Sequence, residues 1–434
     1  MSEVAKKKRY ALVGTGARCG MYIKAILGTF SADAELVGFC DVNQTRMRNH
    51  LKNAQAEFSC EQIPFYGAED FEKMLEEQKV DVVIVTTIDR QHHHYIIRAM
   101  ECGCDAVTEK PMTVDVEKCK AIVDAVERTG RSLRVTFNYR YSPARTKVKD
   151  LLMQGVIGKV KAIHFEWLLD TVHGADYFRR WHRDKRNSGG LMVHKATHHF
   201  DLVNWWLDSS PETVFGLGDL KFYGRENAEG RGVTSFYDRG TGHPNAKGDP
   251  FALDLSEEPD LKEMYKDAEH EDGYLRDQSV FGDGINIEDT MNVVVRYKSG
   301  TQMSYTLSAY NPWEGYKINF IGEKGRIELE DLEKSYISAA SGELGESLSK
   351  SQKLLVLPHW EKAYEVEVPE AVGGHGGGDD PMLESLFSPH APADPYGRTA
   401  NHIDGARSIL TGLAANQSFM TGLPVQVDAL LCLL

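Results

Sequence analysis

Three histidines lie close together in residues 188–207, which read SGGLMVHKATHHFDLVNWWL. After a Gly-Gly pair, apolar residues recur with the spacing of a buried helix face. His194, His198 and Asp201 follow at spacings of four and three, which predicts that they share one face of a single helix. Imidazoles beside a carboxylate can transfer protons or hold a metal ion. The stretch therefore predicts an active-site helix, and a metal-binding or surface helix is the alternative.

A second chemical pattern stands at the start of the chain. Tyr10–Val13 has a strand pattern, the glycine turn GTGARCG follows at Gly14–Gly20, and a helix pattern and a second strand lead to Asp41. Glycines let the backbone approach a pyrophosphate, which also accepts hydrogen bonds from a helix N-terminus. A carboxylate at the end of the second strand can accept hydrogen bonds from the adenosine ribose, and it repels a 2′-phosphate. The sequence therefore predicts a dinucleotide site that takes NAD and disfavours NADP.

The glycine turn departs from the usual fingerprint at one position. Cys19 stands where a third glycine is expected, and the glycine comes one residue later at Gly20. Arg46, five residues after Asp41, could weaken the discrimination against NADP. We expect the cofactor to be bound by Gly14, Gly16, Ala17, Arg18, Cys19 and Asp41.

Strand and helix patterns alternate up to about residue 140. The strand patterns at Val80–Thr86, Asp105–Thr108 and Leu133–Phe137 are largely apolar, and helix patterns separate them. Such strands form a parallel sheet that is covered on both faces and binds ligands at the carboxyl ends of its strands. The strand ends should therefore add cofactor contacts from Thr86, Thr87, Glu109, Lys110 and Asn138. Of the consecutive histidines 92–94, at most one can face the cofactor, and we expect it to be His92.

The pattern changes after residue 140. Long strand patterns with one polar face predict an α+β domain over residues 141–434, built on an open, mostly antiparallel sheet. An insertion at about 223–284 is rich in Gly, Asp and Glu, and such a segment is either a surface excursion or a lid. We expect an ordered surface excursion that borders the cleft or a subunit contact. The expected fold class is therefore α/β plus α+β. An N-terminal doubly wound Rossmann sheet in residues 1–140 precedes this second domain.

Three features of the last hundred residues complete the expected second domain. Residues 339–352 have a loop pattern, and a helix over 399–419 should pack back against the domain. Between them, GGHGGGDD at Gly373–Asp380 places one histidine among five glycines. Such a segment is either a flexible linker or a close-fitting backbone that presents His375 to a site.

Composition limits the classes of partner. The 434 residues carry a net charge of −14, whereas binding to nucleic acid needs clustered positive charge. We expect no membrane span, because the sequence has no run of about 18 apolar residues. The N-terminus has no apolar signal core, and seven cysteines are few. The expectation is a cytoplasmic protein with reduced thiols that binds neither nucleic acid nor membrane.

Four motifs together resemble a known family. The glycine turn is similar to a GxGxRG form, and Thr86–Pro111 (TTIDRQHHHYIIRAMECGCDAVTEKP) is similar to a pattern that ends in EKP. Asn138–Pro143 (NYRYSP) resembles an N.RF.P motif, and residues 188–207 resemble GGxxxDxxxHxxDxxxWL. These motifs belong to the Gfo/Idh/MocA family of NAD(P)-dependent sugar oxidoreductases. The resemblance covers nearly the whole chain.

The resemblance implies which residues handle the proton. In such enzymes the lysine of EKP and the histidine of the last motif hold the substrate hydroxyl, which here are Lys110 and His198. His194 replaces the acid that the family carries four residues earlier, so its assisting role is open. A metal held by His194 and His198, with His375 or another group as the third ligand, is an alternative, although we expect no metal.

The expected function is hydride transfer between NAD and a secondary hydroxyl, of C3 type, on a sugar, glycoside or cyclitol. An alternative is an NAD-dependent glycosidase or lyase that oxidises C3 transiently, with no net redox change, as in one branch of the family. A second alternative is a non-catalytic NAD sensor. Family resemblance implies a homodimer or homotetramer. The residues expected to shape the sugar pocket are Arg140, Trp181, Arg183, Lys195, His199 and His375.

Overall fold

The computed structural model describes residues 6–334, 351–371 and 374–432. The chain divides into two compact units. The first unit contains Met1–Asn138, Leu255–Arg276 and Gly378–Ala406, and the second contains Tyr139–Asp254, Asp277–Gly377 and Arg407–Leu434. Among the described residues, no helix has the length and apolar character needed to cross a membrane.

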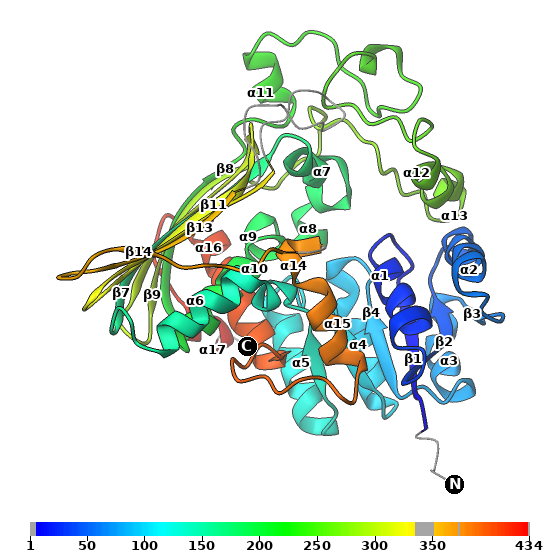
Figure 1. Cartoon of the computed structure of the whole chain (residues 1–434). Coiled ribbons are helices and arrows are strands. Elements are labelled where there is room, and N and C mark those ends of the chain that lie inside the picture. Colours follow the sequence, from blue (N-terminus) through cyan, green and yellow to red (C-terminus); the bar gives the residue numbers. More distant parts are fainter. Residues whose placement is uncertain (1–5, 335–350, 372–373, 433–434) are drawn as a thin grey trace. The chain divides into compact units, whose positions relative to one another are not determined.

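A seven-stranded sheet forms the centre of the first unit (Figure 1). Its order is β15-β6-β5-β4-β1-β2-β3, and all pairs are parallel except β15–β6. The strands are β1 Lys8–Val13, β2 Ala34–Cys40, β3 Phe65–Tyr66, β4 Val82–Val85, β5 Asp105–Thr108, β6 Leu133–Val135 and β15 Ala400–Asn401. Every residue of β4 is buried, as expected for a strand covered on both faces. The predicted doubly wound parallel sheet is confirmed.

Helices accompany this sheet, and the first five of them connect its parallel strands. They are α1 Cys19–Lys24, α2 Gln44–Phe58, α3 Phe71–Glu77, α4 His92–Glu101, α5 Val116–Thr129 and α15 Asp379–Phe387, and α16 His402–Thr421 begins in this unit. Asn43 caps α2 and Asp115 caps α5, because each side chain accepts a hydrogen bond from a backbone N–H of the first turn. The caps fix where both helices begin.

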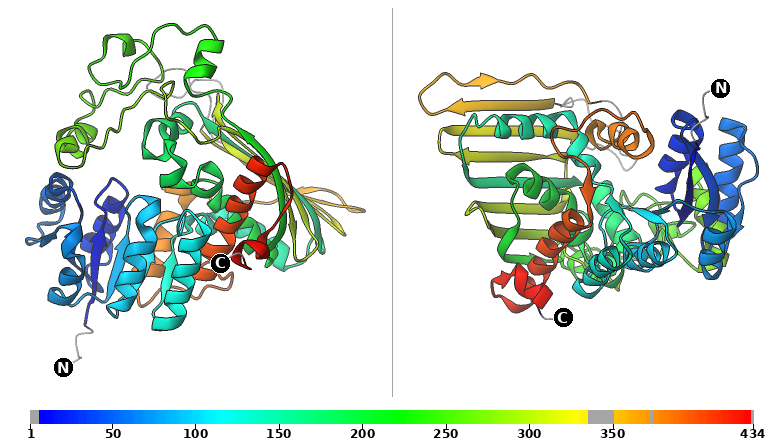
Figure 2. Two further views of the ribbon diagram at one scale, coloured as in Figure 1. Left: turned by 180° about the vertical axis from the view of Figure 1, so that it is seen from behind. Right: turned by 90° about the horizontal axis from the view of Figure 1, so that it is seen from below.

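The second unit is built on a nine-stranded sheet, seen face-on in Figure 2 (right). Its order is β14-β13-β12-β11-β7-β10-β9-β8-β16. The strands are β7 Val160–Asp170, β8 Pro211–Asp219, β9 Thr290–Tyr297, β10 Gln302–Asn311, β11 Glu314–Gly322, β12 Gly325–Lys334, β13 Ser351–Pro358, β14 Tyr364–Glu365 and β16 Val425–Gln426. Among the described pairs, β7–β10 is the one parallel pair, which confirms the predicted open, mostly antiparallel sheet.

The helices of the second unit include the segment with the three histidines. They are α6 Pro143–Met153, α7 His173–Arg179, α8 Lys185–Ser188, α9 Leu191–His194, α10 Thr197–Leu207, α11 Arg225–Gly230, α14 Gly374–Gly377 and α17 Val427–Cys432. The predicted single helix over 188–207 is therefore wrong. Ala196 N–H donates to the oxygen of Leu191, five residues back, and His198 N–H donates to that of Lys195, three back. This change of hydrogen-bond spacing breaks the helical phase between His194 and His198.

Two segments of the chain need separate comment. Residues 223–284 form an ordered insertion, and Leu255–Arg276 within it belongs to the first unit, with α12 Pro259–Met264 and α13 Glu269–Asp272. Of the loop expected at 339–352, residues 339–350 lie outside the described residues, and 351–352 begin β13. Gly373 also lies outside them.

Candidate cofactor site and candidate catalytic residues

The glycine turn after β1 has a backbone that strongly favours glycine at its first position. Gly14 has a φ of +87°, and a Cβ there would lie 2.5 Å from the backbone nitrogen of Thr87. Thr86 Oγ1 donates to the oxygen of Gly14 at 2.5 Å. The end of β4 thus packs directly against the turn, which leads through Ala17 and Arg18 into α1.

The departure at Cys19 has a packing reason. Cys19 is fully buried and its Sγ lies 3.2 Å from His50 Nε2. The same ring nitrogen lies 3.2 Å from the oxygen of Thr15 and 3.3 Å from that of Gly16. A Cβ at Gly20 would meet the ring at an ordinary 3.7 Å. The usual fingerprint has a glycine at the position of Cys19 so that the helix can pack closely. In this chain the buried thiol and the imidazole pack against the turn instead.

Asp41, at the end of β2, faces the same turn. Its Oδ2 accepts hydrogen bonds from the backbone N–H of Thr15 and, at 2.8 Å, from Thr15 Oγ1. Its Oδ1 accepts from Asn43 N–H at 2.9 Å. Oδ2 thus uses both of its lone pairs, whereas Oδ1 keeps a second lone pair with which the half-buried group can accept a hydrogen bond from a ribose hydroxyl. The turn and the acid therefore fit a dinucleotide.

Glu109 joins the turn to the end of β5. Its Oε1 accepts from Arg18 Nε at 2.6 Å and from the hydroxyl of Tyr22 at 2.7 Å. Burial alone would raise the pKa of Glu109, but the charges of Arg18 and Lys110 and these hydrogen bonds lower it. The carboxylate is therefore ionised, and it fixes the turn that carries Lys110.

Asn138 joins the same network through a residue that the sequence did not indicate. Asn138 Nδ2 donates to Asp379 Oδ1 at 2.6 Å, and Arg18 Nη2 lies 3.7 Å from the same oxygen. Asp379 begins α15. Its only signal in the sequence is the Asp pair after the glycine-rich segment, which gave no reason to place it beside Asn138.

His92 braces two loops at the carboxyl ends of the strands. Its Nδ1 lies 2.8 Å from the oxygen of Pro111 and its Nε2 lies 3.1 Å from that of Thr87. The ring is 1% exposed, and burial lowers its pKa. The backbone N–H of Lys110 donates to Glu109 Oε2 at 3.3 Å, and the Lys110–Pro111 peptide bond is cis. His92 thus positions the loop of Lys110.

In the second unit, His198 stacks on a tyrosine. The rings of Tyr139 and His198 lie 4.0 Å apart with an interplanar angle of 12°. The guanidinium carbon of Arg145 lies 4.0 Å from the centre of the same tyrosine ring, and Lys195 Nζ donates to the Tyr139 hydroxyl at 3.2 Å. The His375 ring lies 5.9 Å from that of Tyr139. Tyr139 therefore brings together three predicted site residues, although the sequence did not single it out.

His375 has a strained backbone. Its φ of 53° and ψ of 40° lie in the left-handed region, which costs a non-glycine residue about 1–2 kcal/mol. Gly376 continues the same conformation with a φ of 65°, and Arg145 Nη1 donates to the oxygen of His375 at 3.3 Å. The glycine-rich segment therefore holds His375 in one position beside Tyr139.

His194 belongs to a different aromatic group. Its ring lies 4.2 Å from that of His182, 5.5 Å from that of Tyr177 and 5.8 Å from that of Trp181. Trp181 itself stacks on His182 at 3.6 Å. Because His194 and His198 have these separate neighbours, the predicted shared face is wrong.

A hydrogen-bonded chain lies beside this group. The Tyr177 hydroxyl lies 3.0 Å from His173 Nε2, and His173 Nδ1 lies 2.8 Å from Glu314 Oε1. Glu314 is 3% exposed. Burial raises the pKa of Tyr177 to about 12, so the phenol is protonated at neutral pH. The arrangement can relay a proton, and the sequence spacing gave no sign of it.

Two residues predicted for the sugar pocket, Arg140 and His199, have contacts typical of the protein core. Arg140 forms a two-point ion pair with Asp201, with Nε to Oδ2 at 2.7 Å. His199 stacks on Trp167 at 4.0 Å and contacts the Tyr305 hydroxyl at 2.6 Å.

Arg183 is held by the insertion. It donates to the backbone oxygens of Ser279, at 3.2 Å, and Asp283, at 2.7 Å, and burial lowers its pKa to about 10. Within the described residues, no three His, Cys, Asp or Glu side chains gather in a way that could hold one metal ion.

Comparisons with known proteins cover both units. Residues 8–137 match the model described as "Oxidoreductase family, NAD-binding Rossmann fold", and residues 149–427 match "Oxidoreductase family, C-terminal alpha/beta domain". The protein YteT of Bacillus subtilis (strain 168) is 34% identical over 422 residues, which are 93% of this chain and 94% of YteT.

A further relative matches half of the chain, and a solved structure matches its fold. The scyllo-inositol 2-dehydrogenase (NAD(+)) of the same organism is 28% identical over 220 residues, 49% of this chain and 57% of that protein. The crystal structure of aldose-aldose oxidoreductase from Caulobacter crescentus, complexed with glycerol, has a TM-score of 0.62 at 15% identity. It covers 97% of this chain and 100% of that one, a likeness of fold.

Proposed function

Because the chain belongs to the Gfo/Idh/MocA family of NAD-binding oxidoreductases, we propose that it is an NAD-dependent dehydrogenase of a small polyol. The substrate class is a sugar, glycoside or cyclitol, oxidised at a secondary hydroxyl of C3 type. The related scyllo-inositol 2-dehydrogenase (NAD(+)) supports a cyclic polyol. A nicotinamide cofactor bound at the glycine turn would supply the hydride chemistry.

One observation carries the proposal. The buried carboxylate of Glu109 holds Arg18 of the glycine turn on one side and sets the adjacent Lys110 on the other. The backbone of Lys110 is thereby held at the carboxyl end of β5, within the dinucleotide-binding unit. Ligands bind at this edge of a parallel sheet. A group placed there can move a proton at the reacting hydroxyl.

The proposed division of roles follows the family motifs. Lys110 and His198 handle the proton of the substrate hydroxyl, and their places in the two motifs support this pairing. Tyr139 orients His198 by stacking on it. His194 assists. Trp181, Lys195 and His375 bind the sugar, and of these Lys195 and His375 lie against Tyr139.

The test is a panel of sugars, glycosides and cyclitols, followed by NADH absorbance and by release of the aglycone. NADH formation supports the dehydrogenase. Aglycone release without net NADH would instead support a redox-neutral glycosidase, and binding of NAD without either reaction would support a sensor.

A variant pair sharpens this test. Lys110→Met should abolish turnover while NADH binding, measured by fluorescence titration, survives. Lys120→Met is the control, because Lys120 is a solvent-exposed lysine of the same unit that pairs with Asp124. Normal turnover in Lys110→Met would refute the assigned role.

We propose a homodimer or homotetramer that pairs through the nine-stranded sheet. Phe215 and Leu217 of β8 and Val294 of β9 are 37%, 63% and 53% exposed, and Phe215 lies opposite Val294. Apolar side chains on the solvent face of a sheet are typical of an interface. Light scattering after size exclusion should show an oligomer that Val294→Lys weakens.

A further inference from the structure

The segment Leu255–Arg276, named here the strap, is packed against the cofactor-binding residues. It belongs to the first unit, although more than a hundred residues separate it from the rest of that unit in the chain. Tyr265 is 4% exposed and Ala268 is fully buried. Asn43, which caps α2, donates its Nδ2 to the oxygen of Ala268 at 2.9 Å. The strap is therefore an ordered part of this unit.

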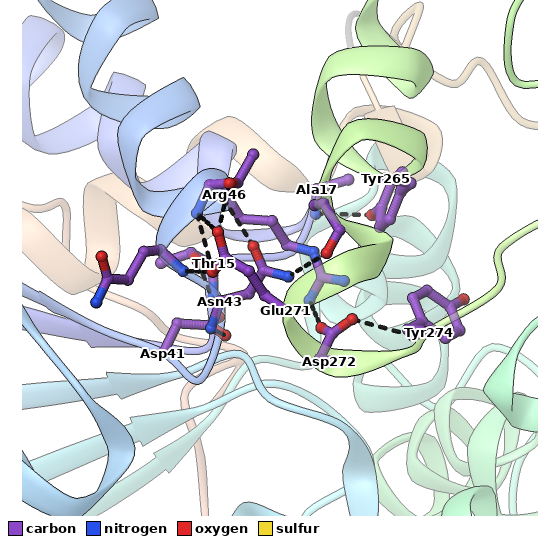
Figure 3. Close-up of polar contacts among 12 residues, drawn as sticks. Thr15, Ala17, Asp41, Asn43, Arg46, Tyr265, Glu271, Asp272 and Tyr274 are labelled. Atoms are coloured by element: carbon purple, nitrogen blue, oxygen red, sulfur yellow. Dashed lines mark hydrogen bonds and ion pairs between the residues drawn. The ribbon is translucent and has the colours of Figure 1, made fainter.

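Tyr265 reaches the glycine turn itself. The backbone N–H of Ala17 donates to the Tyr265 hydroxyl at 3.1 Å, and Figure 3 shows the two residues facing each other. Ala17 lies between the turn and α1, where backbone N–H groups bind the diphosphate of a dinucleotide. The strap thus contacts the place where the cofactor is recognised.

Glu271 of the strap lies on the N-terminus of α2. Its carboxylate accepts hydrogen bonds from the backbone N–H groups of Gln44 and Thr45 and from Thr45 Oγ1, the last at 2.5 Å. Arg48 Nη2 lies 3.2 Å from it. An anion is favoured at such an N-terminus, which begins three residues after Asp41. Glu271 therefore fills the position in which a phosphate beside the ribose would otherwise be stabilised.

Arg46, the cation that could favour NADP, is also engaged by the strap. Its Nη1 lies 2.7 Å from Asp272 Oδ2, and its guanidinium lies 5.6 Å from the ring centre of Tyr265 and 5.7 Å from that of Tyr274. The residue is 8% exposed. Among the described residues, its Nε and Nη2 have no hydrogen-bond partner, so they are donors that an adenosine can satisfy. Its positive charge is already compensated by Asp272.

We propose that the strap recognises the adenosine ribose of the cofactor, and that Glu271 and Asp272 exclude a 2′-phosphate. A phosphate would meet three carboxylates, those of Asp41, Glu271 and Asp272, and would find the α2 N-terminus filled. A 2′-hydroxyl carries no charge and meets no such repulsion. This inference rests on the proposed function, because it explains why the cofactor is NAD and not NADP.

The experiment is a fluorescence titration of the full chain with NADH and with NADPH. Wild type should bind NADH more tightly. Glu271→Gln keeps the shape and one acceptor oxygen while it removes the charge. It should leave the Kd for NADH nearly unchanged and lower the Kd for NADPH about tenfold, the effect of one nearby like charge at a protein surface. The double variant Glu271→Gln with Asp272→Asn should lower the NADPH Kd further, because it frees the charge of Arg46.

Glu263→Gln is the matched control. Glu263 is an acid of the same strap that pairs with Lys52 at 2.9 Å and is 49% exposed, and neither Kd should change. An unchanged NADPH Kd in both Glu271 variants, or equal weakening of NADH and NADPH, overturns the inference. If wild type itself prefers NADPH, the NAD assignment of the proposed function fails as well. If no sugar in the panel is oxidised, the cofactor-binding results still stand. The proposed dehydrogenase function and the role of the strap can therefore be refuted separately.

Discussion

Gly14→Ala should destabilise the first unit by an amount that separates two physical causes. At a φ of +87°, any L residue is strained by about 1–2 kcal/mol. The added methyl would also lie 2.5 Å from the backbone nitrogen and 2.7 Å from the Cα of Thr87, neither of which is the end of a flexible side chain. Overpacking of this kind adds about 1–3 kcal/mol, so the expected loss is about 2–5 kcal/mol.

Gly103→Ala is the matched control. Gly103 has a φ of +86° in the same unit, but no heavy atom lies within 4 Å of the position of its added Cβ. The two variants share the strain and the entropic effect of alanine on the unfolded chain. Gly103→Ala should therefore lose only about 1–2 kcal/mol. The difference between the variants measures the contact with Thr87 alone.

The assay is urea unfolding followed by two signals. All six tryptophans lie in the second unit, so tryptophan fluorescence reports that unit and far-UV circular dichroism reports both. Gly14→Ala should shift the circular dichroism transition and weaken NADH binding. If the two variants lose the same free energy of unfolding within about 0.5 kcal/mol, the close contact between the glycine turn and Thr87 is not present as described.

Three further predictions concern buried and strained groups. Asp201→Ala should cost about 3–5 kcal/mol in urea unfolding by tryptophan fluorescence, because it removes the carboxylate that pairs with the buried guanidinium of Arg140; a loss below about 1 kcal/mol would contradict this. Burial lowers the pKa of His50 from 6.5, so its contribution to stability is present above pH 6.5 and is lost as pH falls through the folded-state pKa. His50→Gln should therefore flatten the fall in melting temperature between about pH 7.5 and about pH 5.5, and an unchanged slope would argue against a buried neutral ring. His375→Gly should keep or raise stability, by up to about 1 kcal/mol, while kcat/KM falls; a variant with full activity would show that the strained backbone serves no site.

Local patterns in the sequence predicted the cofactor turn well. Gly14, Arg18 and Asp41 lie within about thirty residues, in a strand–turn–helix–strand unit whose geometry follows from short-range constraints. The motif around Lys110 likewise follows one strand end. For these residues, the order along the chain already fixes which of them can meet a dinucleotide.

The histidine segment shows where local periodicity fails. A spacing of four residues predicted that His194 and His198 share a face, but this holds only while the helical hydrogen bonds continue. The four-residue spacing is lost at Ala196 and His198. His198 then stacks on Tyr139, whereas His194 meets His182 edge-on, so the two histidines have different surroundings. The surroundings of the two histidines depend on packing partners from other parts of the chain, and the spacing of residues within the segment does not indicate those partners.

The strap is the clearest case of a role that the sequence left undetermined. Its residues have no apolar period, and Tyr265 meets Ala17 across a separation of 248 residues. The acid Asp41 alone predicted NAD, whereas the carboxylates of Glu271 and Asp272 became part of that argument only once the chain had folded. The turn and Asp41 were determined by the sequence because their contacts are local. The strap was decided by tertiary structure, because a contact between distant segments depends on the path of all the chain between them.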